Sequence, residues 1–261
     1  MSGLHVEVAG KGPPLVLLHG WAMHGGVLAP LAARLRDAFT LHVVDLPGHG
    51  RSREAGVPLA LGPCARAVLD AVPAAPWLGW SLGGMVALQA AHLRPAAVPA
   101  LVMLCASPRF VRGSDWRHAV SPELIRDFAT GLREDWRGTL DRFIALEAFG
   151  SDDARGEIRA LRRDVLAHGE PDAAVLADGL DVLERSDLRP LLPGLRVPSL
   201  WLAGRRDRLV DPRGMAEAAA LAPRATVRVI EHAGHAPFLA HAGTVAAHVR
   251  DFLAGVPAGD A

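Results

Sequence analysis

A serine in a glycine-rich turn is the first feature of the chain that points to chemistry. Gly79-Trp80-Ser81-Leu82-Gly83 matches the pattern G-x-S-x-G, with an apolar run before it and helical spacing after it. Small residues on both sides of the serine permit the tight strand-to-helix turn that exposes a nucleophilic hydroxyl. A structural serine in a glycine turn is the alternative, but the flanking strand and helix favour a nucleophile. We therefore predict that Ser81 attacks a carbonyl carbon.

A serine hydroxyl is a poor nucleophile at neutral pH and needs a base within hydrogen-bond distance. The chain has 12 histidines, so their positions must decide between them. His235 follows the last predicted strand, and the glycine before it lets a loop carry the imidazole over the edge of a sheet. His232 is the alternative, but it lies closer to the end of that strand. We predict that His235 is the general base.

The third catalytic group is an acid that orients the histidine. Asp207 lies on the loop after an apolar run, whereas Asp211 precedes Pro212 and is typical of a helix cap. We therefore favour Asp207 over Asp211. The order serine, aspartate, histidine along the chain is that of the α/β hydrolases and differs from the orders in chymotrypsin and subtilisin.

Acyl transfer also needs N–H groups that bind the oxyanion formed during attack. In this architecture one donor belongs to the residue after the nucleophile, here Leu82, and the other to the loop after an early strand. That loop opens with His19-Gly20-Trp21, so the backbone N–H of Trp21 is the second candidate. The alternative for Trp21 is a core aromatic residue with no catalytic role.

Other chemistry has little support. Asp45 and the turn at 48–50 are expected to brace the site rather than to react. The spacing of histidine, cysteine and carboxylate residues predicts no metal site, and no glycine-rich loop predicts a nucleotide site. We expect no cofactor.

Composition limits the partners and the cellular location. The 28 basic and 28 acidic residues give a formal net charge of zero, so nucleic acid and anionic membranes are not expected partners. No apolar run approaches the roughly 20 residues of a membrane span. The N-terminus lacks the pattern of a signal peptide, and Cys64 and Cys105 are expected to be reduced, buried thiols. We therefore expect a cytoplasmic monomer.

The catalytic candidates lie among short apolar runs that alternate with stretches of helical spacing. This alternation predicts an α/β fold, with a mostly parallel central sheet and helices on both faces. Between 109 and 189 charge density rises and strand-like runs vanish. We therefore expect a hydrolase core at 1–108 and 190–261, with a helical lid at 109–189. The predicted strands lie at 4–8, 15–18, 41–44, 77–79, 101–104, 199–202 and 226–230.

These motifs make the whole chain resemble the α/β-hydrolase superfamily. Within it, the chain is similar to the biotin-pathway esterases that demethylate a pimeloyl ester carried on acyl-carrier protein. The resemblance rests on the segments 19–21, 79–84 and 234–238 and, more specifically, on the lid segment 142–146. It implies a carboxylesterase with a Ser-His-Asp acyl-enzyme mechanism.

The resemblance also implies where the acyl chain binds, between the tryptophan of the oxyanion loop and a lid helix. Glu147 stands where glutamine is expected, and a carboxylate there would repel an acidic substrate. The implied substrate-binding residues are Trp21, Ser81, Leu82, Phe143, Ile144, Ala145, Leu146, Glu147 and His235.

The same resemblance implies that acyl-carrier protein, an acidic partner, docks on lid arginines. The matching positions are Arg142, Arg155, Arg159 and Arg162. At about 100° per residue, Arg155, Arg159, Arg162 and Arg163 share one stripe of a helix. Glu157 and Asp164 fall on the far side, and a third face is apolar. The residues of the apolar face are Ala154, Ile158, Leu161 and Val165.

Two alternatives remain open for the arginines and for the function. The segment 109–189 holds 13 arginines against 17 acidic residues, so the stripe is also compatible with a solvated face that binds nothing. A general short-chain carboxylesterase, a lactonase and a C–C-bond hydrolase fit the same catalytic residues. A hydrolase-fold protein that binds a ligand without turnover is the alternative from another class.

Overall fold

The central sheet of the protein has seven strands, all but one parallel. The computed structural model describes residues 3–169 and 171–256, and the strand order is β1-β3-β2-β4-β5-β6-β7. This arrangement confirms the predicted α/β class and mostly parallel sheet. The strands are β1 Val6–Gly10, β2 Pro14–Leu18, β3 Thr40–Val44, β4 Trp77–Trp80, β5 Leu101–Leu104, β6 Ser199–Gly204 and β7 Ala225–Ile230.

The apolar runs become the interior strands because both faces of a parallel sheet are covered. β4, β5 and β6 are buried along their whole length. The edge strand β1 is mostly exposed and pairs antiparallel with β3, with Val8 opposite His42. The carboxyl ends of the parallel strands meet at one edge, which is where ligands bind in open α/β sheets.

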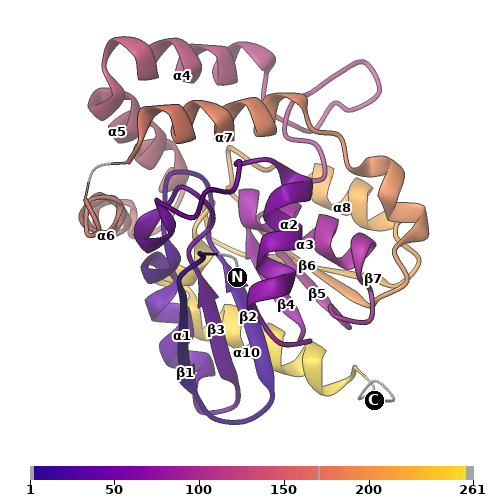
Figure 1. Cartoon of the computed structure of the whole chain (residues 1–261). Helices are drawn as coiled ribbons and strands as arrows, with labels where there is room; N and C mark the ends of the chain where they lie inside the picture. The colour runs from indigo at the N-terminus through magenta and orange to yellow at the C-terminus, as the bar shows by residue number, and fades with distance from the viewer. Residues whose placement is uncertain (1–2, 170, 257–261) are drawn as a thin grey trace.

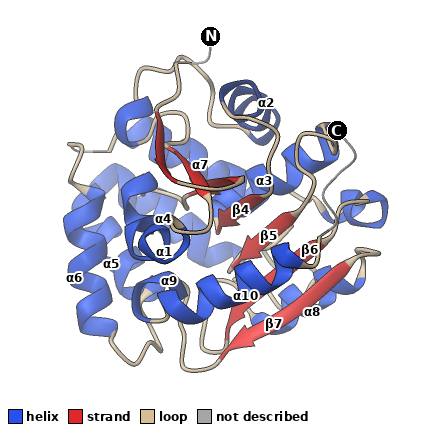
Figure 2. Ribbon diagram, turned by 90° about the horizontal axis from the view of Figure 1, so that it is seen from below, coloured by secondary structure: helices blue, strands red, loops and turns tan. Residues whose placement is uncertain are grey.

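Helices cover both faces of the sheet (Figures 1 and 2). One face carries α1 and α10, which pack against each other, and the other carries α2, α3 and α8. The helices of the core are α1 Ala29–Leu35, α2 Leu61–Ala71, α3 Leu82–Leu93, α8 Pro212–Ala220, α9 Pro237–Ala240 and α10 Ala242–Ala254. Short 3₁₀ helices lie at η1 Gly25–Leu28, η2 Gly50–Ser52 and η3 Arg189–Gly194.

Four helices between β5 and β6 form a separate group above the sheet (Figure 1). They are α4 Pro122–Glu134, α5 Trp136–Glu147, α6 Ala154–Val165 and α7 Ala173–Arg185. Asp135, Asp153 and Asp172 cap the starts of α5, α6 and α7 by accepting backbone N–H groups. These caps explain why the chain turns sharply between helices instead of forming one long helix.

The chain enters and leaves this helical group at adjacent points. The backbone N–H of Leu188 donates to the carbonyl of Pro108 at 2.8 Å. Arg109 and Arg189 each pair with Asp115 and with Asp187, at distances between 2.6 and 3.4 Å. The two crossing segments are therefore held together at the base of the group.

The remaining expectations about the chain concern its cysteines and its longest helices. Cys64 and Cys105 are both buried and unpaired, as the sequence predicts. Within 3–169 and 171–256, no helix combines the length and the apolar character needed to cross a membrane.

Candidate active site

Ser81 lies at the sharp turn between β4 and α3. Its backbone angles, φ 54° and ψ −121°, fall in a region that non-glycine residues rarely adopt. A Cβ atom on Gly79 would lie 2.3 Å from the carbonyl oxygen of Gly83, and one on Gly83 would lie 2.5 Å from that of His19. No side chain fits at either position because the backbone of a neighbouring segment is too close, so both residues must be glycine. The turn holds the Ser81 hydroxyl at the N-terminus of α3.

The three predicted catalytic side chains form one continuous hydrogen-bonded chain. The Oγ of Ser81 lies 2.9 Å from Nε2 of His235, and Nδ1 of His235 lies 2.8 Å from Oδ2 of Asp207. The other carboxylate oxygen of Asp207 accepts the backbone N–H groups of Leu209 and Val210 at 2.8 and 2.9 Å. Asp207 can therefore orient His235 with Nδ1 as the donor and with Nε2 facing the Ser81 hydroxyl, free to accept the serine proton.

The alternative residues lie away from this chain. The side chain of His232 is 59% exposed, and its Nδ1 lies 2.7 Å from a guanidinium nitrogen of Arg206. Asp211 accepts the backbone N–H of Arg213 at 2.8 Å and caps α8. Neither reaches Ser81, so the geometry favours His235 and Asp207.

Two backbone donors lie beside Ser81. A Cβ atom on Gly20 would be 3.1 Å from the Cβ of Ser81, which places the loop after β2 against Ser81. Within the described ranges, the backbone N–H groups of Trp21 and Leu82 donate to no protein acceptor. Since buried N–H groups normally have partners, two free donors at this point suit a developing oxyanion.

The indole of Trp21 is fixed by the helical group. Its Nε1–H donates to the carbonyl of Leu176 at 2.9 Å, and its ring meets that of Phe143 edge-on, with centroids 4.6 Å apart. A Cβ atom on Gly179 would lie 2.4 Å from the indole. Trp21 thus lies between α5 and α7, where it can wall a pocket for an acyl chain.

Trp80 supports the loop that carries His235, a role that is not predicted from the sequence pattern. Its Nε1–H donates to the backbone carbonyl of His235 at 2.8 Å, and its ring packs on Phe238. The only signal in the sequence was an aromatic residue directly before the nucleophile, and that gave no reason to expect a contact 155 residues away.

A second supporting layer lies behind the loop that follows β2. His19 donates through Nδ1 to the carbonyl of Gly20 at 2.8 Å and accepts the backbone N–H of Leu46 at 2.9 Å. Burial, followed by the charge of His49, lowers the pKa of His19 to about 3, so the ring is neutral. Asp45 accepts the N–H of Gly25 at 2.7 Å and thereby braces the same loop, as expected.

The predicted substrate-binding segment of α5 is only partly directed inward. Phe143, Ile144 and Glu147 are buried, and Leu146 is half-buried. Ala145 is exposed, because residues two apart on a helix face different directions. The structure therefore does not bring Ala145 to the site, and the expectation that the whole segment lines it is corrected to its inward face.

Two further carboxyl groups are buried in the lid helices, one of them near Asp207. Glu147 is 1% exposed and its Oε2 has no partner; burial, then the charges of Asp207 and Glu157, raise its pKa well above the usual value. Glu157 accepts a hydrogen bond from the Ser151 hydroxyl at 2.7 Å, and mainly burial raises its pKa to about 7. Glu157 was expected on the far side from the arginine stripe, and that side of α6 faces the protein interior.

The predicted docking arginines are all exposed, but they differ in their partners. Arg162 donates to Asp141 at 2.7 Å and Arg142 to the Thr139 hydroxyl at 3.0 Å. Arg155 and Arg159 make no hydrogen bond or ion pair with any other described residue. The stripe on α6 therefore keeps two unneutralised guanidinium groups in solvent.

The whole site is closed in this structure. Ser81 is 2% exposed, His235 0% and Asp207 6%. Ser81 is therefore not accessible to solvent in this conformation. In the part of the chain that the structure describes, no cluster of three or more histidine, cysteine or carboxylate side chains is arranged to hold a metal ion.

Known proteins share both the sequence and the fold of this chain. A protein of Xanthomonas campestris pv. campestris named pimeloyl-[acyl-carrier protein] methyl ester esterase is 55% identical over 254 residues, which cover 97% of this chain and 100% of that protein. A protein of the same name from Stenotrophomonas maltophilia is 53% identical over 257 residues, 98% of this chain and 99% of that protein.

Solved structures agree on the fold. An esterase from Exiguobacterium antarcticum has a TM-score of 0.86 at 19% identity, covering 97% of this chain and 96% of that one. The enol-lactonase from Burkholderia xenovorans LB400 has a TM-score of 0.84 at 23% identity, covering 96% of each chain. Residues 13–242 match the family described as alpha/beta hydrolase fold. Together with the sheet order and the nucleophile turn, these matches show that the chain belongs to the α/β-hydrolase family.

Proposed function

We propose that the protein is a serine carboxylesterase that hydrolyses the methyl ester of a pimeloyl chain carried on acyl-carrier protein. The observation that carries the chemistry is the hydrogen-bonded chain from Asp207 through His235 to Ser81. The substrate is inferred from the names of relatives that are 53–55% identical over nearly the whole chain.

The first half of the reaction forms an acyl-enzyme. His235 accepts the proton of the Ser81 hydroxyl through Nε2 while Oγ attacks the ester carbonyl carbon. The oxyanion accepts hydrogen bonds from the backbone N–H groups of Trp21 and Leu82. As the tetrahedral intermediate collapses, His235 returns the proton to the departing methoxy oxygen and methanol leaves.

The second half releases the acid. A water molecule takes the place of methanol, loses a proton to Nε2 of His235 and attacks the acyl carbon. The same two amides stabilise the second oxyanion. Collapse breaks the bond to Ser81, whose oxygen regains the proton from His235, and the free acid departs and loses its proton to water.

We propose that residues 109–189 act as a lid over this site and that the acyl chain lies between Trp21 and the inward face of α5. Phe143 supports this placement because its ring already contacts the indole. Glu147 lies on the same face of α5 and fits this role as the neutral acid. An uncharged carboxyl group there would not repel an acyl chain with a carboxylate product, which removes the conflict expected from the sequence.

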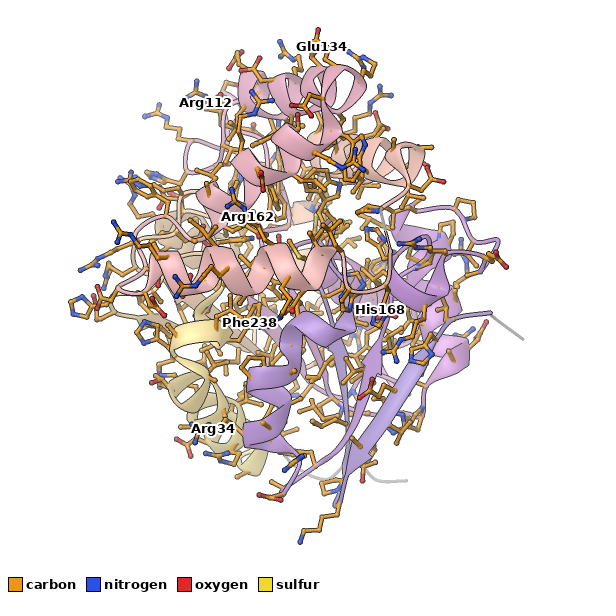
Figure 3. The ribbon with its side chains drawn as sticks, turned by 90° about the vertical axis from the view of Figure 1, so that its left-hand side faces the viewer. Arg34, Arg112, Glu134, Arg162, His168 and Phe238 are labelled. Atoms are coloured by element: carbon orange, nitrogen blue, oxygen red, sulfur yellow. The ribbon has the colours of Figure 1, made fainter. Side chains whose placement is uncertain are left out.

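The carrier is proposed to dock on the lid through α6. Arg155 and Arg159 are exposed and have no acidic neighbour within bonding distance among the described residues, so an acidic partner would neutralise them at little cost. Figure 3 shows α6 running across one side of the molecule, with Arg162 and His168 labelled near it. Arg162 contributes less in this proposal, because Asp141 already pairs with it.

We further propose that the protein acts in the cytoplasm as a monomer. Two unpaired, buried cysteines suit a reducing compartment, and carrier-linked acyl chains are cytoplasmic substrates in the implied pathway.

The proposal is tested by complementation of a biotin auxotroph that lacks this esterase. The parent chain is expected to restore growth without biotin, and Ser81→Ala is expected to fail. Purified protein should release methanol from the carrier-linked pimeloyl methyl ester, with kcat reduced more than about 10³-fold in Ser81→Ala. Equal activity of the two proteins would contradict the assignment of Ser81, and turnover of p-nitrophenyl esters alone would indicate a general carboxylesterase.

A further inference from the structure

His24 connects the loop that follows β2 to the helix α6. It lies three residues after Trp21 and is 5% exposed. Its Nε2 lies 2.6 Å from the backbone carbonyl of Asp164, in the last turn of α6. Its Nδ1 accepts the backbone N–H of Gly26 at 3.0 Å and so caps η1. One side chain thus makes a bond within the core and a bond to the lid.

These two bonds define the protonation state of His24. A carbonyl oxygen only accepts, so Nε2 must carry a proton, and Nδ1 must lack one because it accepts an amide N–H. The ring is therefore the neutral Nε2–H tautomer. Burial, the first cause, and the nearby His168 lower the pKa of His24, while the Asp164 carbonyl and the carboxylates of Asp45 and Asp164 oppose that shift. The rings of His24 and His168 have centroids 4.4 Å apart.

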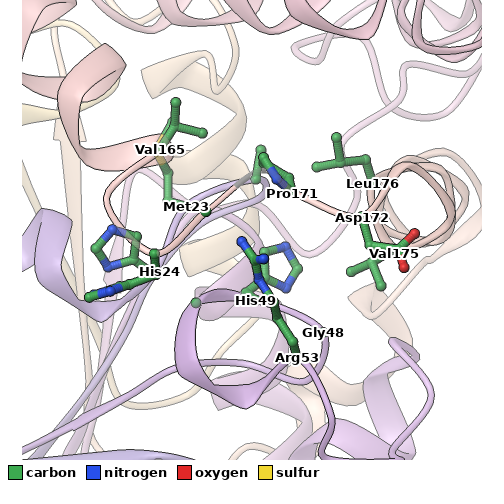
Figure 4. A pocket seen from close by; sticks show the side chains of 14 residues that line it. Met23, His24, Gly48, His49, Arg53, Val165, Pro171, Asp172, Val175 and Leu176 are labelled. Carbon is green, nitrogen blue, oxygen red and sulfur yellow. The ribbon is translucent and has the colours of Figure 1, made fainter.

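The same loop has a second bond to the lid. The Nε1–H of Trp21 donates to the carbonyl of Leu176 in the first turn of α7. Two side-chain donors within the segment 21–24 therefore reach backbone carbonyls at the end of α6 and at the start of α7. Figure 4 shows this junction from close by, with Met23 and His24 of the loop and Val165 of α6 around one pocket.

Ala22 and Met23 lie between the two hydrogen-bonded side chains of Trp21 and His24. Their backbone conformation is not one that the residues favour on their own. Ala22 has φ 63°, in the left-handed region that non-glycine residues seldom adopt. The segment's own backbone contributes one long bond, from the N–H of Met23 to the carbonyl of Gly20 at 3.4 Å. Surrounding contacts must therefore hold the segment in this conformation, and with it the direction of the Trp21 N–H.

We propose that His24 is a positioning residue that holds the oxyanion loop in its productive geometry only while α6 is seated on the core. This inference rests on the proposed role of the Trp21 N–H in catalysis. Closure of the lid and completion of the oxyanion hole then occur together. The reason is that α6, which the carrier is proposed to contact, is hydrogen-bonded through His24 to the loop that binds the oxyanion.

Two substitutions separate the two bonds of His24. In His24→Asn the amide oxygen takes the place of Nδ1, so the cap on Gly26 is kept while the bond to Asp164 is lost. In His24→Gln the amide nitrogen reaches the place of Nε2, so the bond to Asp164 is kept while the cap is lost. His92→Asn, at the exposed end of α3, is the matched control.

The first measurement is steady-state hydrolysis of p-nitrophenyl butyrate, with Ser81→Ala as the blank. His24→Asn is expected to lower kcat about three- to tenfold, the effect of one lost hydrogen bond, without raising KM. His24→Gln and His92→Asn are expected to keep kcat within about twofold of the parent. A parental kcat in His24→Asn, or equal losses in His24→Asn and His24→Gln, would overturn the proposal.

The second measurement does not depend on turnover. Hydrogen exchange of the amides at 21–23 and 164–167 is expected to accelerate together in His24→Asn and to stay at the parental rate in His24→Gln. Parental exchange at both segments in His24→Asn would also overturn the proposal. If the parent hydrolyses no ester, the proposed function fails, and the exchange experiment still decides whether His24 joins the two segments.

Discussion

The indole Nε1–H of Trp80 donates a 2.8 Å hydrogen bond to the backbone carbonyl of His235. This bond ties the residue before Ser81 to the loop that carries His235. The loop has a second support, because the backbone N–H of His235 donates to the carbonyl of Glu147 at 3.1 Å. Ser81 and His235 are therefore held together by the indole of the neighbouring Trp80 as well as by their own hydrogen bond.

Trp80→Phe removes the indole donor but keeps most of the packing on Phe238. The buried carbonyl of His235 then lacks this partner, which costs about 1–3 kcal/mol and loosens the loop. We expect kcat to fall about tenfold or more, since the distance between His235 and Ser81 is no longer fixed. Steady-state kinetics and thermal unfolding of the purified variant check this, and an unchanged kcat at reduced stability would show that Trp80 only packs.

His232 is a nearby control for testing whether His235 is the general base. His235→Ala should lower kcat more than about 10³-fold because nothing else in reach accepts the Ser81 proton. His232→Ala should leave kcat near the parental value, because its side chain is exposed and bonded to Arg206. Labelling of Ser81 by a fluorophosphonate should follow the same order. Comparable losses in both variants would contradict the assignment.

Gly179→Ala tests the contact between α7 and Trp21. Alanine normally stabilises a helix interior by about 1 kcal/mol relative to glycine, but here the new Cβ would lie 2.4 Å from the indole. We expect destabilisation of about 1–3 kcal/mol and a lower kcat/KM. Gly243→Ala in α10 is the control, since a Cβ there meets nothing within 4 Å; it should be neutral or stabilising. A stabilising Gly179→Ala would refute the contact.

Because of the two buried carboxyl groups, we expect the free energy of unfolding to decrease as pH rises. The pKa of Glu147 is raised by burial and by Asp207, and that of Glu157 is raised to about 7, both from an ordinary value of 4.5. Above that ordinary value the unfolded chain releases protons that the folded chain retains, so unfolding becomes easier with increasing pH. The loss continues up to about pH 7 for Glu157, and for Glu147 it continues until the pH passes its own raised pKa.

Glu147→Gln replaces one of these two titrating carboxyl groups with an amide that does not titrate. Its Tm should fall less than that of the parent between about pH 5 and about pH 8, and Glu134→Gln, at an exposed position, should behave like the parent. Thermal unfolding across this range measures the difference. Parallel Tm profiles for Glu147→Gln and the parent would mean that Glu147 is ionised in the folded protein.

Charge reversal on α6 tests carrier docking. Arg155→Glu with Arg159→Glu should raise KM for the carrier-linked ester about five- to thirtyfold, from two exposed pairs worth up to about 1 kcal/mol each. KM for a free pimeloyl methyl ester should not change. Arg66→Glu on α2 is the control. An unchanged KM for the carrier-linked ester would leave the arginine stripe as a solvated face.

The sheet and the three residues of the hydrogen-bonded chain could be predicted from the sequence because both follow from local patterns. Buried parallel strands such as Leu101–Leu104 are continuous apolar runs, and the nucleophile turn demands glycine at fixed offsets. The inward direction of Glu157 was not predictable, because a carboxyl group is normally solvated and only tertiary packing buries it. The bond from Trp80 to His235 joins residues 155 apart and leaves no periodic signature.

The hydrogen bond between Pro108 and Leu188 bears on how the helical group can vary in length. Because the entry and exit of the helical group are adjacent and clamped by Arg109 and Arg189, everything between them is a closed excursion from neighbouring strands β5 and β6. Such an excursion can be lengthened, shortened or exchanged between relatives while strand pairing stays in register. The pairing of β5 with β6, and with it the start of the loop that carries Asp207, is thereby insulated from changes of length in the helices above.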